Sequence, residues 1–148
     1  MTIDNSNTNC PTLTLSDQLA SLGWSDFFQE QIRESDDTAA QPVRITGVEK
    51  NSFLVSNGQS EWLATLAGKL QFKSAGIYPV VGDWVMAKDS VIIQLLDRRN
   101  ILSRTAAGSH HKPELVSGRE QAMAANLDEV WIVCGLDRDF NLRRIERY

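Results

Sequence analysis

Residues 42–66 read PVRITGVEKNSFLVSNGQSEWLATL, and their apolar side chains recur at nearly every second position. A period of two places alternate side chains on opposite faces of a chain, which is the pattern of a half-buried β-strand. Lys50-Asn51-Ser52 and Asn57-Gly58 interrupt this pattern, and both are typical of tight hairpin turns. The stretch therefore predicts three short strands joined by two turns.

Two further strands are predicted downstream, from Val80 to Ala87 and from Val91 to Leu96, with a turn at Asp89-Ser90 between them. A longer connection, residues 67–79, precedes the pair. Five short strands in about 55 residues suit a small closed barrel. We therefore expect a mainly β fold, a five-stranded OB-fold barrel over residues 41–97, with an SH3-like barrel as the second candidate.

The chain before the barrel predicts little regular structure. Residues 1–15 are polar and lack periodicity, so a disordered tail is expected there. Residues 16–40 predict a short helical segment and a linker. Ser16 is the expected N-cap of a helix that Gly23 stops, and Ser25 the expected cap of a second helix.

The chain after the barrel predicts an unfinished domain. Residues 98–120 have no sustained apolar face and are expected to form a basic, flexible connector, followed by a short helical or turn segment at 121–126. Residues 127–136 form an apolar run that predicts a buried strand, and residues 138–148 open an amphipathic helix. A strand and a helix begin a βαβ unit, which needs a parallel partner strand. Residues 121–148 are therefore predicted to start an α/β domain that the sequence does not complete.

Charge is distributed unevenly along the chain. The net charge is −4, yet residues 1–40 hold one basic and seven acidic side chains, while residues 98–119 hold five basic and one acidic. A local basic segment can contact phosphate even when the whole chain is acidic. For this segment RNA contact and an inert linker are equally open, because a solvated linker can carry the same charges.

Several classes of protein are disfavoured by what the sequence lacks. No apolar run approaches the roughly 18 residues of a membrane span, and the N-terminus does not resemble a secretory signal. Cys10 and Cys134 lie in unlike contexts, which indicates a reduced, cytoplasmic protein without a disulfide. His110-His111 has no cysteine or acidic cluster at ligand spacing, so we expect no metal site.

Enzymatic motifs are also missing. The sequence has neither the Gly-x-x-x-x-Gly-Lys-Ser/Thr phosphate loop nor an Asn-Lys-x-Asp base-reading motif, so no catalytic or GTP-binding residue is assigned. Aromatic residues on a small barrel can stack on bases, but Trp62 and Trp84 are assigned to the core. Asp83, after Gly82, is expected to bond nearby backbone amides before a strand begins.

Several segments together resemble one family, the ribosome small-subunit-dependent GTPases (RsgA, also called YjeQ). The resemblance covers about residues 15–148, and its last two segments are the specific ones. The segments are Leu22-Gly23-Trp24, Val81-Gly82-Asp83-Trp84, Arg98-Arg99-Asn100-Ile101-Leu102-Ser103-Arg104, Gln121-Ala-Met-Ala-Ala-Asn126-Leu-Asp128 and Phe140-Asn141-Leu142-Arg143-Arg144-Ile145-Glu146-Arg147-Tyr148.

The resemblance implies an N-terminal OB domain, then a circularly permuted GTPase domain, then a C-terminal zinc domain. Residues 127–136 match the first strand of that GTPase domain. The full-length family would use GTP with magnesium and one structural zinc, but no nucleotide or zinc residue of the family has a counterpart here. The family assists late maturation of the small ribosomal subunit, and its OB domain binds ribosomal RNA near the decoding region.

Our leading hypothesis is an N-terminal portion of such a GTPase that binds the small ribosomal subunit and its 16S rRNA but is inactive alone. The alternative is a stand-alone, non-enzymatic OB-fold module that binds RNA or protein. A monomer is expected, with self-association possible through the exposed last strand. The candidate RNA contacts are Arg44, Lys50, Lys69, Lys73, Arg98, Arg99 and Arg104.

Overall fold

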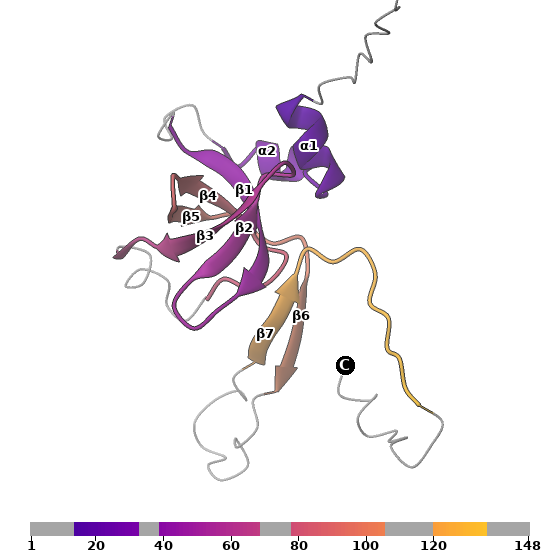
Figure 1. Ribbon diagram of the computed structural model, residues 1–148. Coiled ribbons are helices and arrows are strands. Elements are labelled where there is room, and N and C mark those ends of the chain that lie inside the picture. Colours follow the sequence, from indigo (N-terminus) through magenta and orange to yellow (C-terminus); the bar gives the residue numbers. More distant parts are fainter. Residues whose placement is uncertain (1–13, 33–38, 69–77, 106–119, 136–148) are drawn as a thin grey trace, which may run out of the picture.

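The computed structural model describes residues 14–32, 39–68, 78–105 and 120–135 (Figure 1). The described elements are two short helices and seven strands. In chain order they are α1 (Leu15–Ser21), α2 (Asp26–Gln29), β1 (Gln41–Val48), β2 (Phe53–Ser56), β3 (Glu61–Leu66), β4 (Trp84–Lys88), β5 (Val91–Leu95), β6 (Ile101–Thr105) and β7 (Glu120–Ala125).

Strands β1 to β5 close into a barrel in the order β1-β2-β3-β5-β4, and β4 pairs back onto β1. Each pair of neighbours is antiparallel except β3 and β5, which run parallel. The closed, five-stranded barrel predicted from the period-two pattern is confirmed. The first three strands lie where residues 42–66 placed them, whereas β4 begins at Trp84, four residues later than expected.

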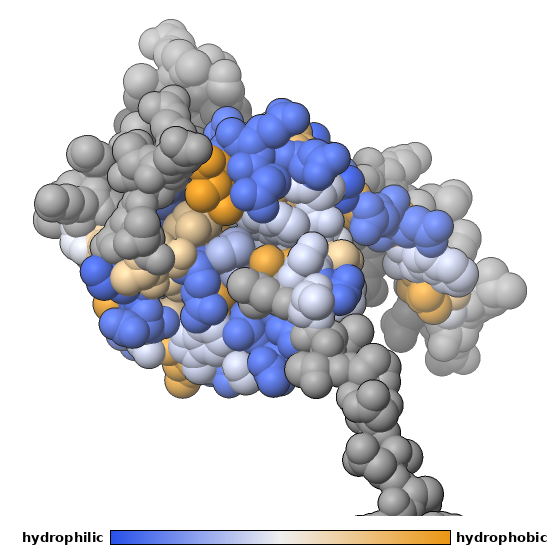
Figure 2. Space-filling model, turned by 90° about the horizontal axis from the view of Figure 1, so that it is seen from above, coloured by the Kyte–Doolittle hydropathy of each residue, from blue (hydrophilic) through white to orange (hydrophobic). Residues whose placement is uncertain are grey.

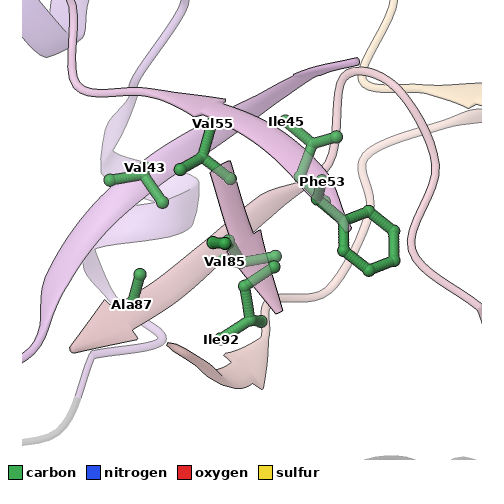
Figure 3. Packing of buried hydrophobic residues seen from close by; sticks show 8 residues of the cluster. Val43, Ile45, Phe53, Val55, Val85, Ala87 and Ile92 are labelled. Atoms are coloured by element: carbon green, nitrogen blue, oxygen red, sulfur yellow. The ribbon is translucent and has the colours of Figure 1, made fainter. Parts of the chain in front are cut away.

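The barrel interior is filled by inward-facing residues of the alternating pattern (Figure 3). Phe53 and Val55 of β2 face inward with Ala64 of β3, and each is at most 1% exposed. Burial of this apolar surface is the main source of stability in a small domain. The cluster comprises Val43, Ile45, Phe53, Val55, Ala64, Val85, Ala87 and Ile92.

A second apolar cluster forms where the helices cover β4. Trp84, which is 1% exposed, packs against Phe28 of α2 and Trp24, with ring centroids 5.8 and 4.7 Å away. Strand β4 is therefore buried on both faces, which explains its continuous apolar sequence. The core assignment of Trp84 is confirmed, and Trp62 packs partly buried against the barrel core. The face seen from above is mostly hydrophilic, with its apolar side chains in small separate patches (Figure 2).

The helix boundaries differ in part from the prediction. Helix α1 is capped by Thr14, not Ser16, because Thr14 and Asp17 bond each other's backbone amides in a capping box. Ser25 occupies the N-cap position of α2 as predicted, but its side chain makes no capping hydrogen bond, and α2 ends at Gln29, earlier than expected. The predicted tail through residue 13 and the linker at 33–38 lie outside the described residues.

Strands β6 and β7 form an antiparallel two-stranded sheet, which we call the arm, and Figure 1 shows it extending from the barrel on the side away from the helices. The prediction of a flexible connector is therefore wrong for residues 101–105, and that of a helical or turn segment is wrong for 121–125. Neither stretch alternates clearly between apolar and polar residues, so pairing between distant segments decides their structure. The intervening residues 106–119 lie outside the described residues.

The predicted buried strand at residues 127–136 does not form in its described part. Residues 127–135 belong to no helix or strand, and no ladder partner pairs with them within the described chain. Val130, Trp131, Ile132 and Val133 are 51%, 82%, 47% and 89% exposed. A lone apolar segment cannot satisfy its backbone as a strand without a neighbour. The helix predicted for 138–148 lies outside the described residues.

Gly82 makes the attachment of the arm to the barrel possible. Its φ of +90° suits glycine, and a Cβ there would overlap the carbonyl oxygen of Ala125 at the end of β7. Ala125 donates its N–H to the Val81 carbonyl at 2.9 Å, and Gly82 donates to the Ile45 carbonyl at 2.8 Å. The turn is therefore hydrogen-bonded to β1 through Gly82 and to β7 through Val81.

We expect Gly82→Ala to lower the free energy of unfolding by at least about 2 kcal/mol, because the added methyl meets both backbone strain and a fixed carbonyl. Gly68→Ala is the control, since a Cβ there meets nothing within 4 Å. Urea denaturation followed by far-ultraviolet circular dichroism measures both variants. Equal stability of the two variants would contradict the close approach of Gly82 to the Ala125 carbonyl.

Candidate nucleic-acid interface

Residues Asp97–Asn100, which we call the junction segment, connect the barrel to the arm. Each residue is bonded to a different part of the molecule. The backbone of Asp97 bonds the Gln31 side chain, its N–H lying 2.6 Å from Oε1 and its carbonyl 3.4 Å from Nε2. Arg98, Arg99 and Asn100 bond Asp83, Asn126 and Leu127. Residues 98–100, the start of the predicted flexible connector, are therefore each held by hydrogen bonds, as is Asp97 before them.

A buried ion pair holds the second residue of this segment. The Nε and Nη2 atoms of Arg98 each lie 2.7 Å from a carboxylate oxygen of Asp83, whose side chain is 0% exposed. Asp83 also accepts the N–H of Val80 at 2.8 Å, which confirms the backbone contact expected of it. Two-point contacts between guanidinium and carboxylate are among the strong hydrogen bonds of proteins. Arg98 is thus engaged inside the molecule.

Asn126 is the centre of the junction. It is 2% exposed, has a φ of +54° that asparagine tolerates, and has a partner for each of its four polar groups. Its Oδ1 accepts the Arg99 N–H at 2.8 Å, and its Nδ2 donates to the Gly82 carbonyl at 3.0 Å. Its backbone N–H donates to the Asn100 carbonyl, and its carbonyl accepts from Arg44. The residue joins barrel, junction segment and arm.

Asn100 fixes the chain immediately after Asn126. Its side-chain Nδ2 donates to the Leu127 carbonyl and its Oδ1 accepts the Leu127 N–H, both at 2.8 Å. The side chain thus imitates one rung of a backbone ladder. The start of the exposed apolar segment therefore has a defined position relative to the barrel.

Arg44 is a second internal cation. Its guanidinium donates to the carbonyls of Leu22 and Asn126 and lies over the Trp84 ring, 5.9 Å from the centroid. Burial is the largest cause that lowers the pKa of Arg44 from its ordinary value, and the positive charge of Arg99 lowers it further. Arg44 therefore links the end of α1 and the arm to β1.

Arg99 is the junction cation that faces solvent. Its side chain is 36% exposed, and its guanidinium lies 5.8 Å from the centre of the Phe28 ring. Its Nη2 lies 3.0 Å from Oδ1 of Asp128, a carboxylate that is 74% exposed. An ion pair this exposed contributes little to stability, about 0–1 kcal/mol.

The other predicted contacts are separate from the junction. Lys50 is exposed in the β1–β2 turn, and Arg104 is exposed on β6, where it contacts Oε1 of Gln121 at 3.3 and 3.4 Å. Lys69 and Lys73 lie outside the described residues. The structure therefore brings Arg44 and Arg99 to Asn126 and Arg98 to Asp83, and RNA contact by any of the seven candidates stays a prediction.

Sequence reasoning missed the polar residues that organise this region. Gln31, Asn100 and Asn126 received no role, and Asp83 was not paired with Arg98. The available signal was a polar residue beside apolar neighbours, since Asn126 follows Ala124-Ala125 and precedes Leu127. A buried polar side chain requires partners, but the sequence does not say which.

Two further observations limit the chemistry of the described residues. Among them, no group of three or more His, Cys, Asp or Glu side chains is arranged to hold a metal ion. None of the described helices has the length and apolar character to cross a membrane.

An open groove of about 210 Å³ lies between the start of β6 and the segment after Asn126. Its lining residues are Asn100, Ile101, Leu102, Leu127, Asp128, Glu129 and Val130.

The chain is similar in sequence to several known proteins that share one name. A protein of Vibrio parahaemolyticus, named small ribosomal subunit biogenesis GTPase RsgA 2, is 39% identical over 99% of this chain and 38% of its own length. RsgA of Opitutus terrae is 36% identical over 88% of this chain and 38% of its own length. RsgA of Xylella fastidiosa is 55% identical over 47% of this chain and 19% of its own length.

The chain therefore spans about 38% of the length of the first two relatives. No protein-family model matches the chain. No solved structure matches it either.

We expect removal of either partner of the buried ion pair, in Asp83→Ala or Arg98→Ala, to cost about 3–5 kcal/mol of unfolding free energy, because the other charge is left buried. In the double variant the loss should be smaller than the sum of the two single losses. Urea denaturation of the four proteins measures this coupling. Additive losses would show that the two side chains do not interact.

Proposed function

The chain belongs to the RsgA family of small ribosomal subunit biogenesis GTPases, whose N-terminal part it matches, and from this premise we propose that it docks the protein onto RNA of the small ribosomal subunit. In this proposal the barrel is an OB-fold. The closed strand order β1-β2-β3-β5-β4, in which β3 and β5 run parallel, supports this assignment. OB-folds commonly bind oligonucleotides through charged grooves and exposed loops.

The observation that carries the proposal is the set of exposed cations on a fixed framework. Arg99 faces solvent from the junction segment, and Arg104 faces solvent from β6 of the arm. Lys50 faces solvent in the turn between β1 and β2. Helix α1 lies against the turn at the other end of β2, where a Cβ on Gly58 would overlap the Gln18 carbonyl, so Lys50 lies at the end of β2 that α1 does not cover. These three residues are the proposed phosphate contacts, while Arg44 and Arg98 hold the framework.

Fixed cations bind phosphate more effectively than cations on a loose linker. A flexible segment loses conformational entropy when RNA orders it, and that loss is subtracted from the affinity. The contacts of Gln31, Asp83, Asn126 and Leu127 with the junction segment order it in advance. The ionic contribution should then appear as a strong dependence of RNA affinity on salt.

We further propose that GTP hydrolysis belongs to the part of the family that this chain does not match. In that account residues 127–136 contribute the first strand of a circularly permuted GTPase domain, which would use GTP with magnesium. The exposure of Val130 to Val133 supports this assignment. Four consecutive exposed apolar residues usually mark a surface that another part of the protein or a partner covers, and in this proposal the sheet of the GTPase domain covers them. A structural zinc would likewise belong to the unmatched part.

We predict that Lys50→Gln and Arg104→Gln each weaken binding to single-stranded 16S rRNA fragments and reduce the slope of log affinity against log salt by about 0.7. Each substitution removes one proposed phosphate contact from an exposed position. Fluorescence anisotropy with labelled fragments at several salt concentrations measures both quantities.

Lys88→Gln is the matched control, since it removes the same charge from the end of β4. It should leave the slope nearly unchanged. If Lys88→Gln reduces the slope as much as the other two, the binding surface is not the proposed one; salt-independent binding would contradict phosphate contact altogether.

A further inference from the structure

The guanidinium of Arg99 is held in place before any ligand arrives. Its backbone N–H bonds the buried Oδ1 of Asn126 at 2.8 Å, and its planar head lies over the Phe28 ring. Within the described residues, its side chain has one hydrogen-bond partner, Oδ1 of Asp128. A guanidinium has five N–H donors, so this single contact leaves donors available to an anion.

Asp128 is brought to Arg99 by the backbone around it. The preceding residue, Leu127, has both its N–H and its carbonyl bonded by the Asn100 side chain. The carboxylate itself is 74% exposed and is in contact with water. Its position next to Arg99 therefore follows from the junction, and the ion pair itself adds little stability.

The surroundings of Asp128 are positively charged on one side. Arg44 is near enough that the negative charge of Asp128 raises its pKa while the charge of Arg99 lowers it. Arg44 and Arg99 therefore both lie within electrostatic range of Asp128, and Arg99 is the one whose guanidinium bonds the carboxylate. Without that carboxylate, the pair would present an uncompensated positive potential to solvent.

Carboxylate and phosphate are interchangeable ligands for arginine. Both offer two oxygens in the spacing of the guanidinium fork, and both form charge-assisted hydrogen bonds with it. We propose that Asp128 occupies a phosphate-binding site on Arg99 in the free chain, and that a phosphate of bound RNA displaces it. This inference rests on the proposed function for the identity of the polyanion, but the site itself is a general one for phosphate.

The displacement has two consequences. Asp128 competes with any anion for Arg99, so an isolated, weakly binding anion gains little by replacing it. An RNA that is already bound at other cations supplies its phosphate at a high effective concentration and can displace the carboxylate. The displaced Asp128 also gives up its contact with Arg99, while Asn100 still holds the backbone of Leu127 before it.

The test compares Asp128→Asn with Glu129→Gln, which removes the same charge one residue further along, where the carboxylate accepts from Trp131 Nε1 at 3.0 Å. The probes are a 12-nucleotide single-stranded RNA and inorganic tripolyphosphate, measured by anisotropy and calorimetry. Asp128→Asn should bind both probes about two- to fivefold more tightly than the unaltered chain. Glu129→Gln should change the affinities by much less.

The double variant Arg99→Gln/Asp128→Asn should lose the gain of Asp128→Asn, because the site is then absent. Equal gains in Asp128→Asn and Glu129→Gln, or no gain in Asp128→Asn, would overturn the proposal. A gain with tripolyphosphate but no RNA binding by any variant would support the phosphate site and contradict the proposed function. Absence of binding to both probes would overturn both. Circular dichroism melting confirms that each variant is folded.

Discussion

The described structure depends on one buried asparagine, each of whose four polar groups has a hydrogen-bond partner. Asn126 bonds the turn at Gly82, the backbone of Arg99 and Asn100, and the guanidinium of Arg44. A buried polar group stabilises a fold only when every donor and acceptor has a partner, and an incomplete set would cost more than an apolar replacement. Each of the four polar groups of Asn126 has a partner, so the residue specifies how the arm meets the barrel rather than merely adding stability.

This constraint extends from the barrel to the exposed end of the described chain. Asn100 holds Leu127, Asp83 holds Arg98 and Gln31 holds Asp97, so the junction segment is bonded to the helices, the barrel and the arm. The cations that the junction directs inward, Arg44 and Arg98, maintain the framework. Arg99 is the one that it presents to water, and Asp128 is held beside it. The same contacts therefore explain the rigidity of the connection and the position of the candidate phosphate site.

The sequence predicted the parts of the fold that are encoded locally. The period of two over residues 42–66 identified three barrel strands, and the apolar residues of β4 and β5 identified the remaining two. Ser25 was placed correctly at the N-cap position of α2, which depends on a few neighbouring residues, although its side chain makes no capping hydrogen bond. Ser16 was not the cap, since Thr14 with Asp17 forms the complete capping box.

The prediction failed where distant residues decide the structure. Strands β6 and β7 pair across residues 106–119, and neither carries an alternating pattern of its own. The pairing of Arg98 with Asp83 was not predicted either, because this carboxylate lies 15 residues earlier in the chain and composition cannot reveal the contact. Residues 127–136 were expected to be a buried strand from their apolar character alone, although a strand also needs a neighbour. The sequence therefore predicted which cations belong to the candidate site, but not which of them are held inside the molecule and which face solvent.

The most direct test of a rigid junction is amide hydrogen exchange followed by NMR at three positions. The N–H groups of Arg99 and Leu127 bond the side chains of Asn126 and Asn100, and the N–H of Ala125 bonds the Val81 carbonyl. If the junction is rigid, these amides should be protected to a degree approaching that of the Ile45 amide in the barrel. Exchange at the rate of an unstructured peptide, with Ile45 still protected, would contradict the account.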